Sequence, residues 1–487
     1  MNYRMTSYVL GQIAIVEAIL LTIPLILAIS YGEDTVFAFG ITILALIVFG
    51  LPFSVKKPKN RDFRAREGFV SVALSWILMS LFGSLPFFLS GHIPNFIDCL
   101  FETISGFTTT GASILNDIES MPKSLLFWRS LTHWIGGMGV LVFVIAIIPK
   151  SDVKIMHLFR AESPGPQVGK LVSKLKFTAR ILYGIYIALT LSQVILLLIG
   201  KMSVYDSFIH AFGTAGTGGF SNMNQSIAAF DSVYIDIIIT IYMFIFAISF
   251  NIYHLILIGN IKQAIKSEEL RAFVSIVLVS VIIITISLSL NSVYNTFGET
   301  LRYSFFQVNS IVSTTGYTTA DFATWPLLSQ FVLFFLMFVG ACAGSTGGGL
   351  KVSRIVILIK TGFRELKKTI APRSILNIKF ENKIVDNSIS NGVLSYFAIY
   401  MFIFAFSIAL ISINSEGSTL NFTTNISAVN ACINNIGPGF GKVGPTGNYS
   451  FFNGFSKIVL AFNMLVGRLE ILPMILLFNP KVWKKRL

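Results

Sequence analysis

Four short strings of threonine, serine, asparagine and glycine recur along the chain, each with a glycine in the same place. They are Thr-Thr-Thr-Gly-Ala at 108–112, Gly-Thr-Gly-Gly-Phe at 216–220, Ser-Thr-Thr-Gly-Tyr at 313–317 and Asn-Asn-Ile-Gly-Pro at 434–438. A cation that loses its water needs several carbonyl oxygens in place of its hydration shell. Glycine lets successive carbonyls point toward one axis, because it adopts positive φ without a Cβ clash. The strings therefore favour a cation filter built from main-chain oxygens.

The composition of these strings favours a monovalent alkali ion. None of them contains Asp or Glu, which argues against a carboxylate ring for a divalent cation. A single string of this kind is typical of an ordinary loop turn. Four of them, about 100 to 120 residues apart, indicate a repeated unit instead. The candidate filter residues are Thr109, Thr110, Gly111, Thr217, Gly218, Gly219, Thr314, Thr315, Gly316, Asn435, Ile436 and Gly437.

A second glycine-rich stretch, Gly-Ala-Cys-Ala-Gly-Ser-Thr-Gly-Gly-Gly-Leu at 340–350, lies inside an apolar segment. Each glycine costs a helix interior roughly 1 kcal/mol relative to alanine, so this stretch is expected to unwind. Unwound backbone at membrane depth must line water or be buried in protein. A nucleotide-binding loop is disfavoured, because Leu350 precedes Lys351 and Val352 follows it. A close-packed helix contact remains an alternative.

Arg468 is predicted near the middle of the last apolar segment, where an arginine is costly unless it faces water or a partner. Glu470 is two positions away and points to another helix face. An arginine facing the conduction path, about 10 Å from a cation at an effective dielectric near 20, would oppose it by roughly 1.7 kcal/mol. The alternative is a structural ion pair with an acid on another span.

The composition requires elements that lie in a membrane. The chain has 487 residues, of which 54% are hydrophobic and only 12% charged, so a soluble enzyme fold is excluded as improbable. A bilayer crossing needs roughly 20 apolar residues. Ten segments qualify, at 8–30, 36–55, 70–90, 125–149, 181–200, 234–258, 272–290, 327–356, 393–413 and 459–478. Cys99, Cys342 and Cys432 form no metal-ligand spacing.

The positions of the basic residues predict the orientation. Most Lys and Arg residues fall in segments 56–66, 150–180, 262–271, 351–383 and 481–486, which lie on one side if all ten segments cross. Because cytoplasmic loops collect such residues, both termini are expected in the cytoplasm. The net charge of +14 is then mainly an orientation signal, with some attraction to anionic lipid, and nucleic-acid binding has no support.

Four shorter apolar segments, at 96–107, 205–212, 301–312 and 423–433, directly precede the glycine strings. Segments of this length are typical of re-entrant half-helices. The predicted fold is an all-α membrane protein with two N-terminal transmembrane helices and four pseudo-symmetric helix, pore-loop, helix repeats around a central ion pore. The predicted divisions are a two-helix extension (1–55), pore repeat 1 (67–149), a cytoplasmic linker with repeat 2 (150–260), repeat 3 with a broken second helix (268–361), and a cytoplasmic linker with repeat 4 (362–487).

These motifs resemble the TrkH family of bacterial potassium-uptake subunits, in the superfamily that includes KtrB and the plant HKT transporters. The resemblance covers essentially the whole chain and is carried by residues 101–111, 218–221, 313–318 and 467–470. The two extra N-terminal segments favour TrkH over KtrB. Sodium-selective HKT relatives have serine where the first repeat here has Gly111, so the resemblance implies a potassium-type filter.

The resemblance implies channel-like uptake of potassium, the transported ion, across the bacterial inner membrane, with no enzyme activity and no organic cofactor on this chain. It implies that the stretch with Gly344, Gly347, Gly348, Gly349 and Lys351 is an intramembrane gating loop and that Arg468 is a barrier beneath the filter. The implied partners are a TrkA-like cytosolic ring of nucleotide-binding regulatory subunits and a second copy of the chain in a homodimer. Segments 150–180 and 351–383 would be docking surfaces. Coupling to H⁺ or Na⁺ in a symport remains open.

A different class of function is also open. A secondary transporter could bind a small solute at the broken segment near Gly344. Such folds often use inverted repeats, whereas an even number of crossings per unit gives four parallel copies here. The repeat pattern therefore favours the channel-like hypothesis.

Overall fold

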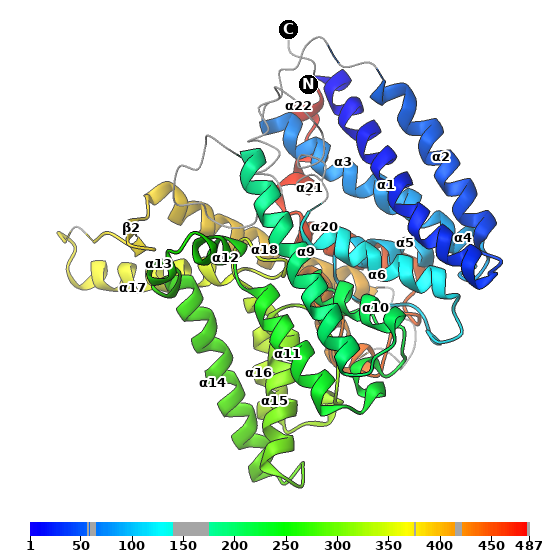
Figure 1. The fold of residues 1–487 in the computed structure, drawn as a ribbon. Coiled ribbons are helices and arrows are strands. Elements are labelled where there is room, and N and C mark those ends of the chain that lie inside the picture. Colours follow the sequence, from blue (N-terminus) through cyan, green and yellow to red (C-terminus); the bar gives the residue numbers. More distant parts are fainter. Residues whose placement is uncertain (56–57, 59–64, 140–174, 375, 414–420, 485–487) are drawn as a thin grey trace.

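A computed structural model describes residues 1–55, 58, 65–139, 175–374, 376–413 and 421–484. The described residues are mostly helical, and the two ends of the chain lie together (Figure 1), where the Met1 amino group donates to Lys484 O at 3.1 Å. The predicted basic segment 150–180 lies mostly outside the described residues, as does the end of the predicted span 125–149.

Two antiparallel helices precede the repeats. Helices α1 (Tyr3–Tyr31) and α2 (Val36–Ser54) are joined by a turn in which Gly32 has φ 65°. They approach closely at a glycine pair: a Cβ on Gly11 would lie 2.9 Å from Gly50 O. Helix α1 also packs against α3 and α6, so the pair flanks the first repeat along one edge of the molecule (Figure 1).

The rest of the chain repeats one unit four times: a long helix, a short helix, an extended strand and a second helix. Repeat 1 contains α3 (Ala65–Gly83), α4 (Leu85–Leu89), α5 (Phe96–Phe107) and α6 (Lys123–Gly137). Repeat 2 contains α9 (Leu175–Ile199), α10 (Val204–Ala215), the 3-10 turn η1 (Ser226–Phe230), α11 (Val233–Ala247), α12 (Phe250–Leu257) and α13 (Ile261–Ile265).

Repeats 3 and 4 follow the same order. Repeat 3 contains α14 (Glu268–Leu290), α15 (Phe297–Val312), η2 (Phe322–Thr324), α16 (Leu327–Val339) and α17 (Val352–Ile370), followed by an antiparallel hairpin of β1 (Lys379–Phe380) and β2 (Lys383–Ile384). Repeat 4 contains α18 (Asn387–Ile413), α19 (Phe422–Ile433), η3 (Gly441–Val443), α20 (Gly454–Arg468), α21 (Leu472–Leu477) and α22 (Pro480–Trp483).

The same local signal starts all four short helices, α5, α10, α15 and α19, which we call the pore helices. A side chain at the position before each helix accepts a hydrogen bond from a first-turn backbone amide, which satisfies one of the free donors there. These capping residues are Asn95, Ser203, Thr296 and Asn421. The predicted half-helices are thus confirmed, with α10 and α15 starting earlier than expected and α10 ending later.

The repeats form a closed ring. The second helix of each repeat packs against the pore helix of the next, in the pairs α6 with α10, α11 with α15, α16 with α19, and α20 with α5. The last pair returns to the first repeat, so the four units surround one axis. The expected all-α fold with two leading helices and four repeats is therefore what the chain adopts.

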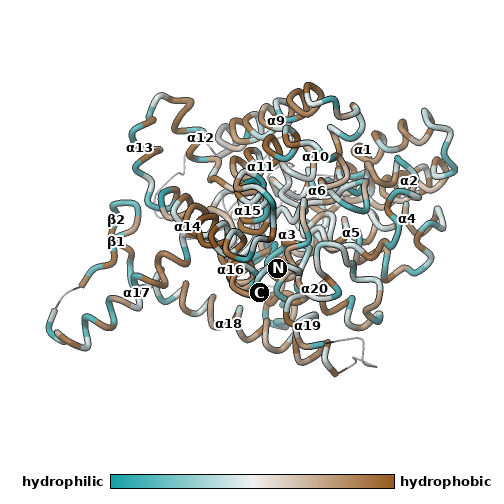
Figure 2. The backbone as a smooth tube through the Cα atoms, turned by 90° about the horizontal axis from the view of Figure 1, so that it is seen from below, coloured by the Kyte–Doolittle hydropathy of each residue, from teal (hydrophilic) through white to brown (hydrophobic). Residues whose placement is uncertain are grey.

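The outer surface of the ring is apolar, as a lipid-facing surface requires. On α16 the side chains of Leu327, Phe331 and Phe335 follow one face and are largely exposed. Figure 2 shows the same hydrophobic character along α14, with hydrophilic residues gathered at the β hairpin. Among the described residues, six helices are long and apolar enough to cross a membrane by themselves, or seven if α11 and α12 count as one span.

Within the described residues, three of the predicted spans are interrupted. The segment 234–258 was predicted to be one helix, but α11 and α12 meet at 90°. The segment 459–478 breaks between α20 and α21, where Glu470 and Ile471 have positive φ. Arg468 therefore lies at the C-terminal end of α20, at the break within this segment, and not inside a continuous helix. The segment 327–356 unwinds between α16 and α17, as its glycines predicted.

Candidate ion pathway and intramembrane loop

The four predicted filter strands share one backbone conformation. In each strand the residue two places before the shared glycine (Gly111, Gly219, Gly316 or Gly437) has positive φ: Thr109 54°, Thr217 55°, Thr314 62° and Asn435 55°. The glycines themselves have φ of 78° at Gly111, 76° at Gly219, 80° at Gly316 and 93° at Gly437. Positive φ is uncommon for a residue with a side chain. Its recurrence at the same place in four strands shows that the strands are structural copies of one another.

Each strand is tied to the pore helix that precedes it. Thr110 N donates to Ser105 O at 2.9 Å, so the strand folds back on the last helical turn. The equivalent bonds are Gly218 N to Gly213 O at 2.8 Å, Thr315 N to Ser310 O at 2.9 Å and Ile436 N to Ala431 O at 2.9 Å. Because these amides are held by the helix, the carbonyl groups of the strands are left to face elsewhere.

Glycine is required where neighbouring strands meet. A Cβ on Gly111 would lie 2.0 Å from Gly218 O in repeat 2, closer than any real contact. The same holds around the ring: Gly219 against Thr315 O at 2.0 Å, Gly316 against Ile436 O at 2.0 Å, and Gly437 against Thr110 O at 2.7 Å. Each glycine thus abuts the carbonyl before the next glycine, and the fourth contact returns to the first strand. The twelve predicted filter residues are brought together around one axis.

A side chain on each pore helix holds the segment that follows its strand. Glu102 accepts from Ser113 Oγ at 3.0 Å and from Ile114 N at 2.9 Å, so its carboxylate holds the segment that follows the first filter strand. The counterparts are His210 with Ser221 Oγ at 2.9 Å, the Gln307 amide accepting from Thr319 N at 3.0 Å in the orientation that satisfies both of its atoms, and Ser427 accepting from Phe440 N at 2.9 Å. In repeat 4 this residue is Ser427, ten residues before its glycine, whereas the other three each lie nine residues before theirs.

Sequence reasoning missed Arg129, which joins repeats 1 and 2. Its Nε donates to Glu102 at 2.5 Å, its Nη1 donates to Ser221 O at 2.9 Å, and its guanidinium lies 3.6 Å from the centroid of the Phe220 ring. Both charged side chains are almost fully buried. A charge within the apolar segment 125–149 was the available signal, since intramembrane charges are rare without a partner.

The glycine-rich segment 340–351, which we call the intramembrane loop, lies directly against the filter strands of repeats 3 and 4. Gly348 N donates to Thr314 Oγ1 at 2.6 Å. A Cβ on Gly348 would lie 2.4 Å from Asn434 O, and one on Gly347 would lie 2.8 Å from Ser313 O. These contacts reach the first residues of the two strands, directly after the pore helices. The predicted loop is therefore unwound and sits at one end of the ring.

The bend in repeat 2 accommodates this loop. Cys342 N donates to Ala247 O at 3.0 Å, and Phe250 N donates to Gly344 O at 2.9 Å, on either side of the break between α11 and α12. Thr346 Oγ1 donates to Phe246 O at 3.2 Å. Exposed main-chain groups of two interrupted segments thus satisfy each other, as backbone away from water must.

Lys351 closes the loop on itself. Its side chain is buried and its ammonium donates to Gly347 O, while its own φ is 73°. Gly340, Gly344 and Gly349 also have positive φ, between 69° and 76°. This high density of left-handed residues explains why the segment cannot continue as a helix.

Arg468 bridges three repeats on the same side of the ring as the loop. It donates to Thr346 O in the intramembrane loop at 2.7 Å and to Gly136 O and Gly137 O at the end of α6 at 2.5 and 2.7 Å. Glu470 pairs with Arg354 at the start of α17 rather than with Arg468. The predicted gate and barrier residues are therefore in direct contact.

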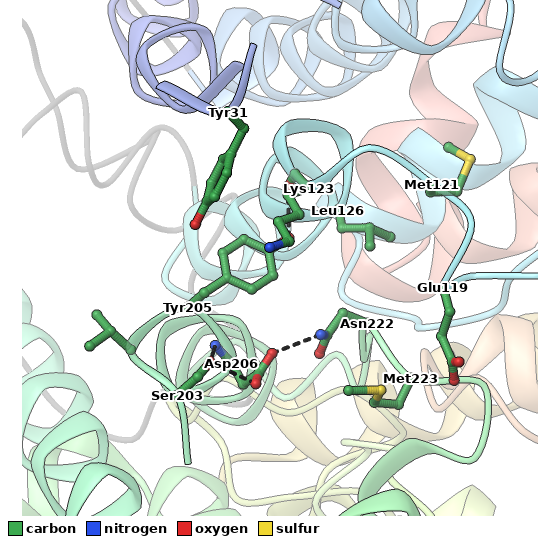
Figure 3. A pocket seen from close by; sticks show the side chains of 11 residues that line it. Tyr31, Glu119, Met121, Lys123, Leu126, Ser203, Tyr205, Asp206, Asn222 and Met223 are labelled. Carbon is green, nitrogen blue, oxygen red and sulfur yellow. Dashed lines mark hydrogen bonds between the residues drawn. The ribbon is translucent and has the colours of Figure 1, made fainter. Parts of the chain in front are cut away.

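A cavity of about 600 Å³ lies at the N-terminal end of α10, where repeats 1 and 2 meet (Figure 3). Lys123 lies 4.6 Å from the Tyr31 ring centroid on one wall, and Asp206 accepts from Asn222 Nδ2 at 2.8 Å on the other. Nearby, a hydrogen bond from the Asn224 side chain lowers the pKa of Asp117 below its usual range. Within the described residues, no group of three or more His, Cys, Asp or Glu side chains could hold a metal ion.

Known proteins resemble this chain over its full length. Residues 33–485 match the TrkH family, described as a cation transport protein. The Trk system potassium uptake protein TrkH of Salmonella typhimurium strain LT2 is 36% identical over 490 residues, covering 100% of both chains. The Trk system potassium uptake protein TrkG of Escherichia coli K12 is 31% identical and covers 99% of both.

A solved structure agrees with this match. The crystal structure of the potassium transporter TrkH from Vibrio parahaemolyticus superimposes with a TM-score of 0.89 at 30% identity, covering 99% of this chain and 100% of that one. The chain therefore belongs to the TrkH family of cation transport proteins.

Proposed function

We propose that this chain is the membrane subunit of a bacterial potassium-uptake system and that potassium passes along the axis of the four filter strands. The observation that carries the proposal is the closed ring of glycine-to-carbonyl contacts, from Gly111 to Gly218, Gly219 to Thr315, Gly316 to Ile436 and Gly437 to Thr110. A ring of main-chain oxygens at one level can replace the water around an alkali ion. The relatives of this chain in Salmonella typhimurium and Escherichia coli are potassium uptake proteins.

The pore helices add a favourable electrostatic term. Each of them ends at the residue before a filter strand, so its carbonyl end, which carries partial negative charge, lies next to the pathway. The strands contain no carboxylate, so they attract a monovalent cation without holding it too tightly to leave. In this assignment the twelve residues named above line the filter, and potassium is a transported substrate rather than a resident cofactor.

The intramembrane loop and Arg468 are assigned to the gate. The loop, which belongs to repeat 3, contacts the filter strands of repeats 3 and 4. Arg468 of repeat 4 links the loop to α6 of repeat 1, across the ring. A positive charge about 10 Å from a permeating cation would oppose it by roughly 1.7 kcal/mol at an effective dielectric near 20. In this assignment the main chain of the loop blocks the pathway. Arg468, which moves with the loop, opposes the cation by its positive charge.

The inner face is assigned as the docking site of a TrkA-like regulatory ring, with the chain itself a homodimer. Helix α17 extends from the loop and carries Arg364, Lys367 and Lys368, and the hairpin adds Lys379. These basic residues suit an acidic partner surface and, by the positive-inside rule, the cytoplasmic side of the inner membrane, where both termini also lie in this proposal. The five divisions predicted from the sequence correspond to the extension and the four units of this transporter.

Flux of ⁸⁶Rb⁺, a potassium analogue, into proteoliposomes tests the proposal. Uptake should exceed that of empty vesicles and should be reduced by K⁺ more than by Na⁺. Rb⁺ uptake at the background rate, together with accumulation of an organic solute, would favour the solute transporter and reject the ion pathway.

A further inference from the structure

A carboxylate outside the ion pathway holds both flanks of the intramembrane loop. Glu269 lies in the first turn of α14, the first helix of repeat 3. Its Oε1 accepts from Ala343 N at 2.7 Å and from Ser353 N at 3.1 Å. Ala343 lies in the first half of the loop and Ser353 in the first turn of α17, directly after it. One carboxylate oxygen therefore pins the two arms of the loop together.

The same turn of α14 is joined to the hairpin on the inner face. Glu381, at the hairpin turn, accepts from Ser267 Oγ at 2.8 Å and from Glu269 N at 3.1 Å. In return Glu381 N donates to Glu268 Oε2 at 3.3 Å, and Lys360 of α17 pairs with Glu268. The hairpin is thus bonded to the residue that holds the loop.

The hairpin is a stiff element. Glu381 and Asn382 have φ of 50° and 59°, the left-handed pair that a two-residue hairpin turn requires. Lys360 Nζ donates to Lys379 O at 2.7 Å, and Phe380 and Val385 pack with Ile357 of α17. A displacement of the hairpin would therefore reach α14 and α17 without being lost in a flexible linker.

We propose that Glu269 is the positioning residue that latches the intramembrane loop closed, and that the hairpin turn at Glu381 is the element through which a force on the inner face releases it. This inference rests on the proposed role of the loop as a gate. Charge-assisted hydrogen bonds to buried backbone amides are among the stronger ones in proteins, so releasing two of them changes the position of the loop.

The chain contains a reporter for this latch. Cys342 lies in the loop and is 1% exposed. With Cys99 and Cys432 replaced by serine, labelling of Cys342 by a membrane-impermeant maleimide reports opening of the loop independently of ion flux.

The experiment uses the full chain in proteoliposomes without a partner protein. Glu269→Ala should raise both ⁸⁶Rb⁺ flux and Cys342 labelling by about tenfold or more, since it removes both hydrogen bonds. Glu269→Gln retains an acceptor oxygen but loses the charge, so it should give a smaller increase than Glu269→Ala. Glu381→Ala should give an intermediate increase and should add nothing to Glu269→Ala, because it acts through the same residue. Glu365→Ala, on the exposed face of α17, is the matched control.

A second variant avoids the carboxylate. Ser353→Pro removes one donated amide in the first turn of α17, where proline is tolerated, and should give a partial increase. Arg468→Ala separates the two hypotheses. Raised flux in Arg468→Ala with no change in Glu269→Ala or Ser353→Pro would overturn the latch and leave the gate in place. No change of flux or labelling in any of the three would overturn the gate itself.

Discussion

The filter strands and the intramembrane loop are both glycine-rich interruptions in a helical membrane protein, yet they are built on opposite principles. The filter occurs four times with the same φ pattern and the same bonds to the pore helices. Among the described residues such a loop occurs once, between α16 and α17, and its bonds go to three different repeats. Selection of an ion requires equivalent oxygens around an axis, whereas closing a passage needs only one element that moves. The symmetry of each region therefore matches its proposed task.

The largest expected effect is at the filter. Gly219→Ala places a Cβ 2.0 Å from Thr315 O, and the positive φ of Gly219 adds strain. We expect ⁸⁶Rb⁺ uptake to fall to that of empty vesicles. The control is Gly184→Ala on α9, where an added Cβ meets no atom within 4 Å and uptake should be retained. Normal uptake in Gly219→Ala would break the equivalence of the four strands.

A smaller effect of opposite sign is expected at the loop. Arg468→Ala removes the hydrogen bonds to Thr346, Gly136 and Gly137 and the positive charge beneath the filter. The loss of a barrier of roughly 1.7 kcal/mol should raise flux about 15- to 20-fold. Arg468→Lys keeps the charge but cannot reach all three carbonyls, so its flux should lie between that of the parent and that of Arg468→Ala. A decrease of flux in Arg468→Ala would assign the residue to assembly and not to the gate.

The contrast also explains which parts could be predicted from the sequence. The filter follows from local signals: glycine at the required positions, four capped half-helices and the same order of elements each time. The unwound loop follows from its glycine density. The 90° bend between α11 and α12 does not, because the segment 234–258 contains neither proline nor glycine. Its cause is tertiary, since the loop supplies hydrogen bonds to Ala247 and Phe250 on both sides of the bend.

The end of α20 at Arg468 could not be predicted for a similar reason. The last apolar segment continues past it, so hydropathy alone places it within a helix. The helix ends because Glu470 and Ile471 adopt positive φ, which their residue types do not favour. The ion pair of Glu470 with Arg354 accompanies this break, and a contact between residues so distant in sequence leaves no local pattern.

The four junctions, where a glycine of one filter strand faces a carbonyl of the next, are not equally tight. A Cβ added to Gly437 would lie 2.7 Å from Thr110 O, against 2.0 Å from the facing carbonyl at the other three junctions. Gly437→Ser should therefore preserve conduction better than Gly316→Ser. We expect the K⁺ over Na⁺ permeability ratio of Gly437→Ser to fall about tenfold, equivalent to about 1.4 kcal/mol, measured from reversal potentials in planar bilayers. An equal loss of conduction in Gly437→Ser and Gly316→Ser would show that the difference in clearance has no consequence.

The smallest effect concerns how this looser junction is held. Repeat 4 has Asn435 where the others have threonine, and its Nδ2 donates to Thr110 Oγ1 at 2.9 Å and to Met464 O at 2.9 Å. Thr110→Val removes the first of these bonds and the one between Thr110 and Thr108, at 2.8 Å, while keeping the shape of the side chain. Since Asn435 keeps its second partner, the cost should be about 1 kcal/mol.

The matched variant for this test is Thr315→Val. It loses the bond with Ser313, at 2.7 Å, but none between strands. Thr110→Val should lower the unfolding midpoint in detergent by on the order of 1 to 2 °C more than Thr315→Val does, and it alone should reduce K⁺ over Na⁺ discrimination. Identical selectivity in the two variants would mean that the carbonyl contact alone holds the fourth junction. The ring would then depend on its main chain at every junction, and the asparagine would have no part in selecting the ion.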